Sequence, residues 1–189
     1  MQLLKDKIRA EGRYLGKGIL KVDSFMNHQI DPKLMKAIGE EFAERFKDTG
    51  ATRILTAETS GIAPALAFAM AMNLPVVFAR KHQPVTMAKN PFKESAESHT
   101  HGNMVELIVS PEYLMPTDRV IIIDDFLASA RTIKALVKLV NTSGATLVGV
   151  GAVIEKAFEG GRAALGDLGV KVESLAAIIN FDDEKINFG

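Results

Sequence analysis

The residues best suited to chemistry lie in the stretch 119–132, which reads RVIIIDDFLASART. Two adjacent carboxylates, Asp124 and Asp125, are followed by a short turn of small residues at 128–132. Unpaired backbone N–H groups in such a turn, and at the start of a helix, can hold a phosphate. The carboxylates accept hydrogen bonds and suit neighbouring hydroxyl groups, or a metal ion that bridges to a sugar. A phosphate site beside a hydroxyl site predicts a ribose 5-phosphate as ligand.

A strand and a helix must position these groups. Val120–Ile123 is an unbroken apolar, β-branched run, as expected of a strand that is buried on both faces of a parallel sheet. After the turn, apolar residues recur at i, i+3, i+4 and i+7 and predict one buried helix face: Ile133, Leu136, Val137 and Val140. The alternative is an ordinary strand–turn–helix connection that happens to carry acidic residues at the strand end.

A second unit of the same kind precedes the first. The pattern predicts a strand at 53–57, a small polar loop at 58–64 and an apolar helix at 65–72. The loop offers hydroxyl and backbone donors for an anion at Thr59, Ser60 and Gly61.

Further elements alternate along the chain. Helices are expected at 1–12, 32–49 and 159–168, strands at 74–79, 104–109, 147–154 and 172–179, and a polar tail at 180–189. Strands that alternate with helices predict an α/β fold, a parallel-rich sheet with helices on both faces. Ligands of such sheets bind at the carboxyl ends of the strands, where both polar loops fall.

The amino-acid composition argues against several classes of function. The 189 residues are enough for one α/β domain, and 23 basic against 23 acidic residues leave no broad basic face for nucleic acid. The absence of cysteine excludes disulfides and cysteine catalysis. No apolar run is long enough for a membrane span, and the N-terminus lacks the apolar core of a signal peptide. We therefore expect a cytoplasmic protein that binds neither nucleic acid nor a membrane.

The stretch 124–132 resembles the phosphoribosyl-pyrophosphate motif of the type I phosphoribosyltransferases: two acidic residues, two apolar residues and a small loop after an apolar run. Two positions depart from that motif. Ala130 stands for the usual glycine, which limits positive φ there, and Arg131 replaces glycine or lysine. The resemblance implies a single domain over 1–189 with the type I phosphoribosyltransferase fold. It also implies a small hood from about 1–30 plus C-terminal segments, and a mobile lid at about 80–103.

The resemblance assigns roles to residues. It implies that phosphoribosyl pyrophosphate, the donor substrate, binds to Ala128, Ser129, Ala130, Arg131 and Thr132, and to Thr59, Ser60 and Gly61. Asp124, Asp125 and Lys81 take the catalytic positions. Mg²⁺ is expected with the highly charged pyrophosphate, although the sequence shows no metal site made of protein side chains alone. A homodimer is also expected.

The purine base that accepts the phosphoribosyl group needs a separate pocket. Phe158 could stack on a flat ring, and Lys156, a donor without acceptor capacity, favours a carbonyl oxygen over an amino group. Asn27 could read a second oxo group. The segments 15–30 and 153–158 resemble the members of the family that use xanthine, whose base contacts match Leu20, Asn27 and Lys156.

The expected reaction is transfer of the 5-phosphoribosyl group to xanthine, giving xanthosine 5'-monophosphate and pyrophosphate. Two alternatives remain open. One is a phosphoribosyltransferase for another purine, either guanine and hypoxanthine or adenine. The other is a non-catalytic regulator that senses the donor.

Overall fold

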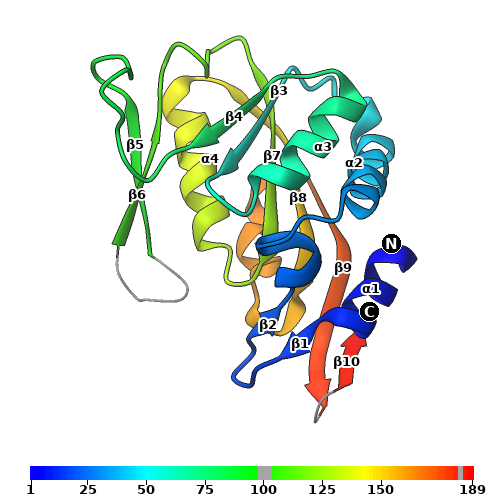
Figure 1. Cartoon of the computed structure of the whole chain (residues 1–189). Helices are drawn as coiled ribbons and strands as arrows, with labels where there is room; N and C mark the ends of the chain where they lie inside the picture. The colour runs from blue at the N-terminus through cyan, green and yellow to red at the C-terminus, as the bar shows by residue number, and fades with distance from the viewer. Residues whose placement is uncertain (98–103, 183–184) are drawn as a thin grey trace.

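The computed structural model describes residues 1–97, 104–182 and 185–189. A six-stranded sheet with the order β10-β9-β8-β7-β3-β4 forms its centre (Figure 1). The five strands from β9 to β4 are parallel, and β10 is antiparallel to β9. The bounds are Arg53–Ala57 for β3, Val76–Ala79 for β4, Arg119–Leu127 for β7, Thr146–Lys156 for β8, Lys171–Asp182 for β9 and Lys185–Phe188 for β10.

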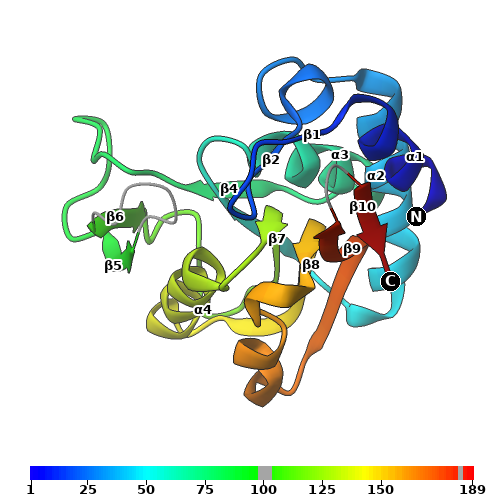
Figure 2. The ribbon, with the colours of Figure 1, turned by 90° about the horizontal axis from the view of Figure 1, so that it is seen from below.

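Helices cover both faces of the sheet, as the alternating pattern predicted. On one face lie α1 (Gln2–Glu11), α2 (Pro32–Phe46) and α3 (Ile62–Met72), and on the other lies α4 (Arg131–Ser143) (Figures 1 and 2). Each face has its own apolar core, with Ile121 and Ile123 of β7 in the first and Val120 and Ile122 in the second. Because β7 is buried on both faces, every position of its apolar run is occupied by a hydrophobic side chain.

The central strand is longer than its apolar run indicated. Asp124 lies opposite Ala152 of β8 and Phe126 lies opposite Ile154, so pairing continues through the acidic residues to Leu127. The strand therefore extends beyond its apolar run and includes both aspartates. The backbone of an aspartate pairs as well as that of an isoleucine, and hydropathy alone does not register this.

The strand order reverses between β3 and β7. From β3 the chain crosses through α3 to β4 on one side, and from β7 it crosses through α4 to β8 on the other. Such a topological switch point opens a crevice at the carboxyl ends of the two strands, where ligands of open α/β sheets bind. Both predicted polar loops begin at these two strand ends.

The N-terminal segment and the chain end, which the family resemblance assigned to a hood, pack together, and we use the name hood for this region. It contains α1, the hairpin β1–β2 (Arg13–Tyr14 and Leu20–Lys21), a π-helix at Asp23–Asn27, and the β9–β10 hairpin (Figure 2). Tyr14 stacks on Phe181 with ring centroids 4.2 Å apart. The prediction of a polar tail was wrong, because residues 180–182 extend β9 and 185–188 form β10.

The predicted lid contains a second hairpin. β5 (Phe92–Glu97) pairs antiparallel with β6 (Met104–Val109) and contacts α4, so part of the segment predicted as a lid is a strand. Residues 98–103 of the lid, and 183–184 of the hood, lie outside the described residues. The predicted helix at 159–168 forms as two short 3₁₀ helices, at Ala157–Glu159 and Ala163–Leu168. Within the described ranges, no helix has both the length and the apolar character needed to span a bilayer.

Candidate active site

A polar cavity of about 160 Å³ lies at the switch point. Six of its lining residues were predicted from the sequence: Thr59, Ser60, Lys81, Asp124, Asp125 and Thr132. They come from the loop after β3, the segment after β4, the end of β7 and the first turn of α4. The fold thus brings the acidic pair, Lys81 and some residues of each polar loop to one site. Gly61 and residues 128–131, also predicted to bind the donor, are not among the residues that line this cavity.

The acidic pair is buried and held by local hydrogen bonds. Asp124 Oδ1 accepts from the backbone N–H of Asp125 at 3.0 Å, and Asp125 Oδ1 accepts from that of Phe126 at 3.0 Å. Burial, and then the charge of Asp125, raise the pKa of Asp124 well above its ordinary value. Asp124 therefore favours its neutral form more than an ordinary aspartate does.

The loop at 128–132 is strained at Ala130. This residue takes φ +64° and ψ +14° immediately before α4 begins at Arg131. We expected its Cβ to disfavour positive φ, yet the alanine adopts that conformation at a cost of about 1–2 kcal/mol. Gly161 packs against the loop, since a Cβ there would meet the carbonyl oxygen of Ala128 at 2.1 Å. Strain of this kind concentrates at functional sites.

The loop after β3 is tied to the segment after β4. Glu58 Oε1 accepts a hydrogen bond from the backbone N–H of Lys81 at 2.6 Å, and Glu58 lines the cavity. We had not predicted Glu58 as a site residue. Its position in the sequence could have indicated this role, because Glu58 directly follows β3. The carboxyl ends of the strands at a switch point meet in the crevice.

Gly61 fits closely against the acidic pair. A Cβ at this position would lie 2.2 Å from Thr56 Oγ1 and 3.0 Å from Asp124 Oδ1. Thr56 Oγ1 is itself buried without a hydrogen-bond partner within the described part of the chain. Only a glycine allows this approach of the loop to β3 and β7.

Gly61→Ala is expected to destabilise the fold by about 1–3 kcal/mol, because overpacking forces the loop away from its contacts. Urea unfolding of both proteins measures this. Gly166→Ala is the matched control, since a Cβ at Gly166 meets no atom within 4 Å. Equal stability of the Gly61 and Gly166 variants would contradict the close packing.

The residues predicted for the base lie around the end of β8. Lys156 Nζ is 3.3 Å from Glu159 Oε1 and 5.5 Å from the ring centroid of Phe126. Phe158 is 45% exposed and packs edge-on against Phe181 at 5.6 Å. Gly18, in the β1–β2 turn, lies beside Phe158.

The other two residues predicted to contact the base, Leu20 and Asn27, lie in the hood. Leu20 is buried at the start of β2. Asn27 ends the π-helix, and its Nδ2 donates to Asp125 Oδ2 at 3.0 Å. The donor end of Asn27, which we expected to read an oxo group of the base, is therefore engaged by the acidic pair.

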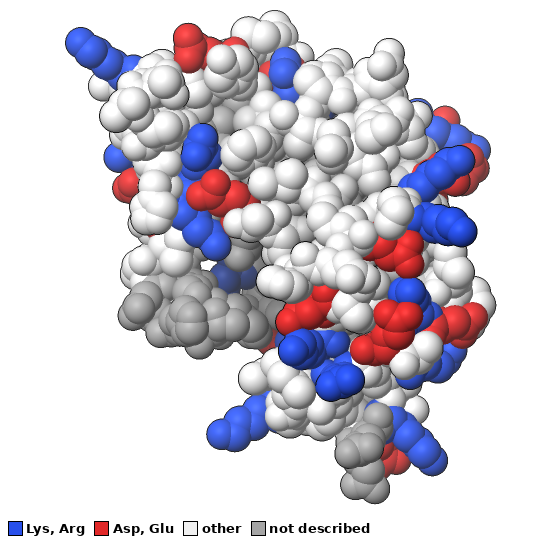
Figure 3. All heavy atoms as spheres, viewed as in Figure 1, with Lys and Arg blue, Asp and Glu red and all other residues white. Residues whose placement is uncertain are grey.

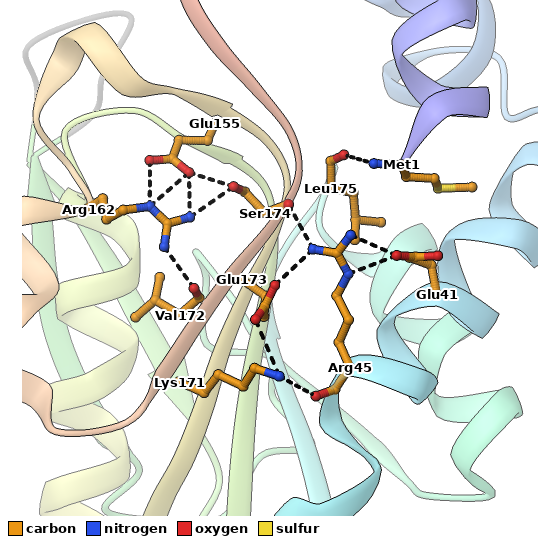
Figure 4. Close-up of polar contacts among 10 residues, drawn as sticks. All are labelled: Met1, Glu41, Arg45, Glu155, Arg162, Lys171, Val172, Glu173, Ser174 and Leu175. Carbon is orange, nitrogen blue, oxygen red and sulfur yellow. Dashed lines mark hydrogen bonds and ion pairs between the residues drawn. The ribbon is translucent and has the colours of Figure 1, made fainter. Parts of the chain in front are cut away.

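A polar network fixes the strand end that carries Lys156 (Figure 4). Arg162 donates to both oxygens of Glu155, from Nε to Oε1 at 2.9 Å and from Nη2 to Oε2 at 2.6 Å, and Ser174 donates to Oε2. Burial alone would raise the pKa of Glu155, but hydrogen bonds from Arg162 and Ser174 outweigh it and the net pKa is lowered. A second set around Arg45 joins α2 to β9.

Arg162→Ala is expected to cost about 1–3 kcal/mol of stability at pH 7, because it leaves a buried carboxylate short of donors. The lowered pKa means that the pair stabilises the fold above the ordinary Glu value of 4.5, and that this contribution is lost as the pH falls through the folded-state pKa. Urea unfolding at pH 7 and pH 4 should thus show a smaller wild-type advantage at pH 4. Arg9→Ala, which breaks an exposed pair with Asp6, is the control. A pH-independent gap would contradict the assignment.

Comparisons with known proteins agree with this geometry. Residues 26–162 match the family described as "Phosphoribosyl transferase domain". Proteins named xanthine phosphoribosyltransferase are similar over the whole chain. The one from Moorella thermoacetica is 50% identical, covering 100% of this chain and 96% of its own, and the one from Stutzerimonas stutzeri is 48% identical, covering 100% and 99%.

Solved structures support the fold. Adenine phosphoribosyltransferase from Giardia lamblia, complexed with 9-deazaadenine, matches with a TM-score of 0.76 at 20% identity, covering 94% of this chain and 98% of that one. The enzyme from Trypanosoma brucei matches with a TM-score of 0.75 at 22% identity, covering 92% and 79%. At these identities the likeness concerns the fold alone. With its acidic pair and the small-residue loop 128–132 at the switch point of a parallel sheet, the chain belongs to the type I phosphoribosyltransferase family.

Proposed function

We propose that the chain is a xanthine phosphoribosyltransferase. It transfers the 5-phosphoribosyl group from phosphoribosyl pyrophosphate to xanthine, giving xanthosine 5'-monophosphate and pyrophosphate for purine salvage. The observation that carries the proposal is that a chain 50% identical along its whole length to an enzyme of that name has the acidic pair, Lys81 and residues of both polar loops around one cavity.

The site residues act by position and charge. A ring nitrogen of the purine forms a bond to C1 of the ribose while the C1–O bond breaks, and the bonding electrons leave with the pyrophosphate. The N–H proton of the purine's five-membered ring passes to the departing pyrophosphate or to water. Asp124 and Asp125 accept hydrogen bonds from the ribose hydroxyls, and the loop 128–132 holds the 5-phosphate. Thr59, Ser60, Gly61 and Lys81 hold the pyrophosphate. Position 128 is an alanine, so the loop supplies no general base there, and catalysis rests on orientation and electrostatic stabilisation.

The donor set fits Mg²⁺ held mostly by substrate. Among the residues that the structure describes, no group of three His, Cys, Asp or Glu side chains could hold a metal ion. Mg²⁺ commonly binds through one or two carboxylates together with substrate phosphates and water. Asp124 and Asp125 would hold the ion with oxygens of the donor, and when bound it neutralises charge on the departing pyrophosphate.

The base lies over the end of β8. Lys156, kept in place by Glu159, donates to a carbonyl oxygen of the purine, while Phe158 and Leu20 contact its ring. Asn27, in the hood, is the remaining residue of the proposed base site.

Ser129→Ala and Arg131→Ala are expected to weaken donor binding by about 1–3 kcal/mol each, the worth of a charge-assisted hydrogen bond to phosphate. Xanthine affinity should change much less. Calorimetry with phosphoribosyl pyrophosphate and Mg²⁺ measures the first quantity. Lys134→Ala, an exposed lysine on the same helix, is the control. Unchanged donor affinity in both variants would show that the 5-phosphate binds at another site.

A homodimer through the groove between α2 and α3 belongs to the same proposal. This groove has a volume of about 1160 Å³ and exposes large apolar side chains, among them Ile30, Leu66 and Met70. Figure 3 shows a largely uncharged surface over α3 with charged residues along its edge. Exposed apolar patches of this kind mark protein interfaces.

Light scattering tests the dimer. The wild type should have twice the 20.5 kDa mass of one chain, and Met70→Asp should have the mass of one. Met104→Asp, at an exposed methionine of β6 outside the groove, should stay dimeric. A monomeric wild type would overturn the dimer. Because the substrates are charged metabolites of the cell interior, the proposal also places the enzyme in the cytoplasm.

A further inference from the structure

The short turn 157–162 lies between the two substrate sites of the proposed function. It follows β8 directly and begins with the 3₁₀ helix Ala157–Glu159. Glu159 Oε1 lies 3.3 Å from Nζ of Lys156, the last residue of β8. The first half of the turn therefore holds the ammonium group that donates to the purine.

The second half of the turn rests on the loop 128–132. A Cβ at Gly161 would lie 2.1 Å from the carbonyl oxygen of Ala128 and 2.8 Å from Cδ1 of Leu127. Non-bonded carbon atoms in contact lie about 3.5–4.0 Å apart, so there is no room for a side chain at this position. Gly161 does not adopt the left-handed conformation that favours glycine. The close approach of the two backbones is therefore what requires a glycine here.

A side chain at position 161 would have to displace either the loop or the turn, and the turn yields more easily. The loop is fixed, because Leu127 and Ala130 are buried in the core on the α4 face of the sheet. The turn lies at the surface, where Phe158 is exposed. A displacement therefore falls on the turn and carries Glu159 with it.

Arg162 anchors the far end of the turn. It donates to both oxygens of Glu155, which precedes Lys156 on β8 (Figure 4). Because this end keeps its place, the segment 157–160 takes up a displacement at Gly161. That segment is the one that holds the lysine.

The reaction needs a fixed separation between the two substrate sites. In the product, the base and the 5-phosphate are joined to one ribose, so covalent geometry sets the distance between a purine oxygen and the phosphate. Lys156 and the loop 128–132 must be spaced to match this distance. A misplacement of about 1 Å can cost about 10²-fold in rate.

We propose that the turn 157–162 is a spacer that fixes the position of Lys156 relative to the loop 128–132. Gly161 and Glu159 are its positioning residues, since the first seats the turn on the loop and the second holds the lysine. The inference rests on the proposed function, in which Lys156 reads the base and the loop binds the 5-phosphate.

Calorimetry with two ligands tests the spacer. Phosphoribosyl pyrophosphate with Mg²⁺ occupies the loop but not Lys156, whereas xanthosine 5'-monophosphate occupies both. The variants are Gly161→Ala, Glu159→Ala and the double variant. Gly166→Ala and Asp167→Ala are the matched controls, because both residues are exposed in the next 3₁₀ helix and a Cβ at Gly166 meets no atom within 4 Å.

A second variant perturbs the same turn without touching the loop. Gly160 has φ +74°, and a Cβ there meets no atom within 4 Å. Gly160→Ala therefore strains the turn alone, and it takes the place of Gly161→Ala in every comparison if the latter does not fold.

Each single variant should bind xanthosine 5'-monophosphate about tenfold more weakly, the worth of one hydrogen bond to a charged group. Its affinity for phosphoribosyl pyrophosphate should equal that of the controls. With both substrates saturating, kcat should fall by up to about 10²-fold, because the base no longer meets C1 at the right place. The double variant should bind the nucleotide no more weakly than the weaker single variant, since both changes act by releasing Lys156.

Three results would overturn the spacer. Equal losses of donor and nucleotide affinity in Gly161→Ala would show that the loop itself is distorted. Losses that multiply in the double variant would show that Gly161 does not act through Glu159. Nucleotide affinity equal to that of the controls would show that the turn positions nothing. If the wild type uses another purine in place of xanthine, the proposed function fails, and the nucleotide of that purine tests the spacer in the same way.

Discussion

The double variant Asp124→Asn, Asp125→Asn is expected to lose at least about 10²–10³-fold in kcat/KM, the typical cost of removing an electrostatic contact to a transition state. Both carboxylates line the cavity at the switch point, and the ribose gains positive charge as the C1–O bond breaks. Neutral amides can accept hydrogen bonds from hydroxyls but cannot balance that charge. Pyrophosphate release at saturating donor and xanthine measures the loss.

The same variant should be at least as stable as the wild type. Burial and the neighbouring charge raise the pKa of Asp124, so the ionised form is disfavoured in the fold and stability is greater below the folded-state pKa than above it. Asparagine removes that penalty at neutral pH. Urea unfolding at pH 7 checks this, with Asp48→Asn, Asp167→Asn as an exposed, remote control pair. Near-normal turnover by the folded Asp124, Asp125 variant would refute the assignment of the ribose site.

Adenine is expected to be a very poor substrate, worse than xanthine by about 10⁴–10⁵-fold in kcat/KM, the range reached when a site's buried polar groups are left unpaired. Lys156 is 8% exposed and is held between Glu159 and the ring of Phe126. Its ammonium group can only donate, so the amino group of adenine would set donor against donor. Guanine and hypoxanthine should fall between the two, since each lacks one oxo group of xanthine.

Lys156→Ala should lower the rate and compress this order. Specificity constants for four purines, measured at one fixed donor concentration in wild type and variant, give the comparison. Lys138→Ala, at an exposed lysine on α4, should leave the order intact. If the Lys156 variant keeps the full order, another residue reads the base.

Local patterns carried much of the fold and of the candidate site. The strand at 53–57 forms with its predicted bounds, and Thr59, Ser60 and Thr132 of the two polar loops lie around one cavity with the acidic pair. Buried strands and the loops that end them leave strong hydropathy signals. Asp31 caps α2 as its type predicts, accepting from the N–H groups of Lys33 and Leu34.

What escaped prediction depends on pairing between distant segments. β5 reads FKESAE, and only its partner β6 makes a strand of so polar a stretch. The sequence contains only a weak indication of the β9–β10 hairpin. Apolar and polar residues alternate in both strands, with the apolar ones at Ile179 and Phe181 in β9 and at Ile186 and Phe188 in β10. No periodicity connects Asn27 with Asp125, so the engagement of its donor end appears only in three dimensions.

The central claim is that this chain transfers a phosphoribosyl group to xanthine, and pyrophosphate release tests it most directly. Wild-type protein is mixed with phosphoribosyl pyrophosphate, Mg²⁺ and, in turn, xanthine, guanine, hypoxanthine, adenine or no base. The account predicts the highest kcat/KM with xanthine, lower values with guanine and hypoxanthine, and close to the base-free rate with adenine. Release that favours adenine, or that is equal with and without xanthine, would contradict it.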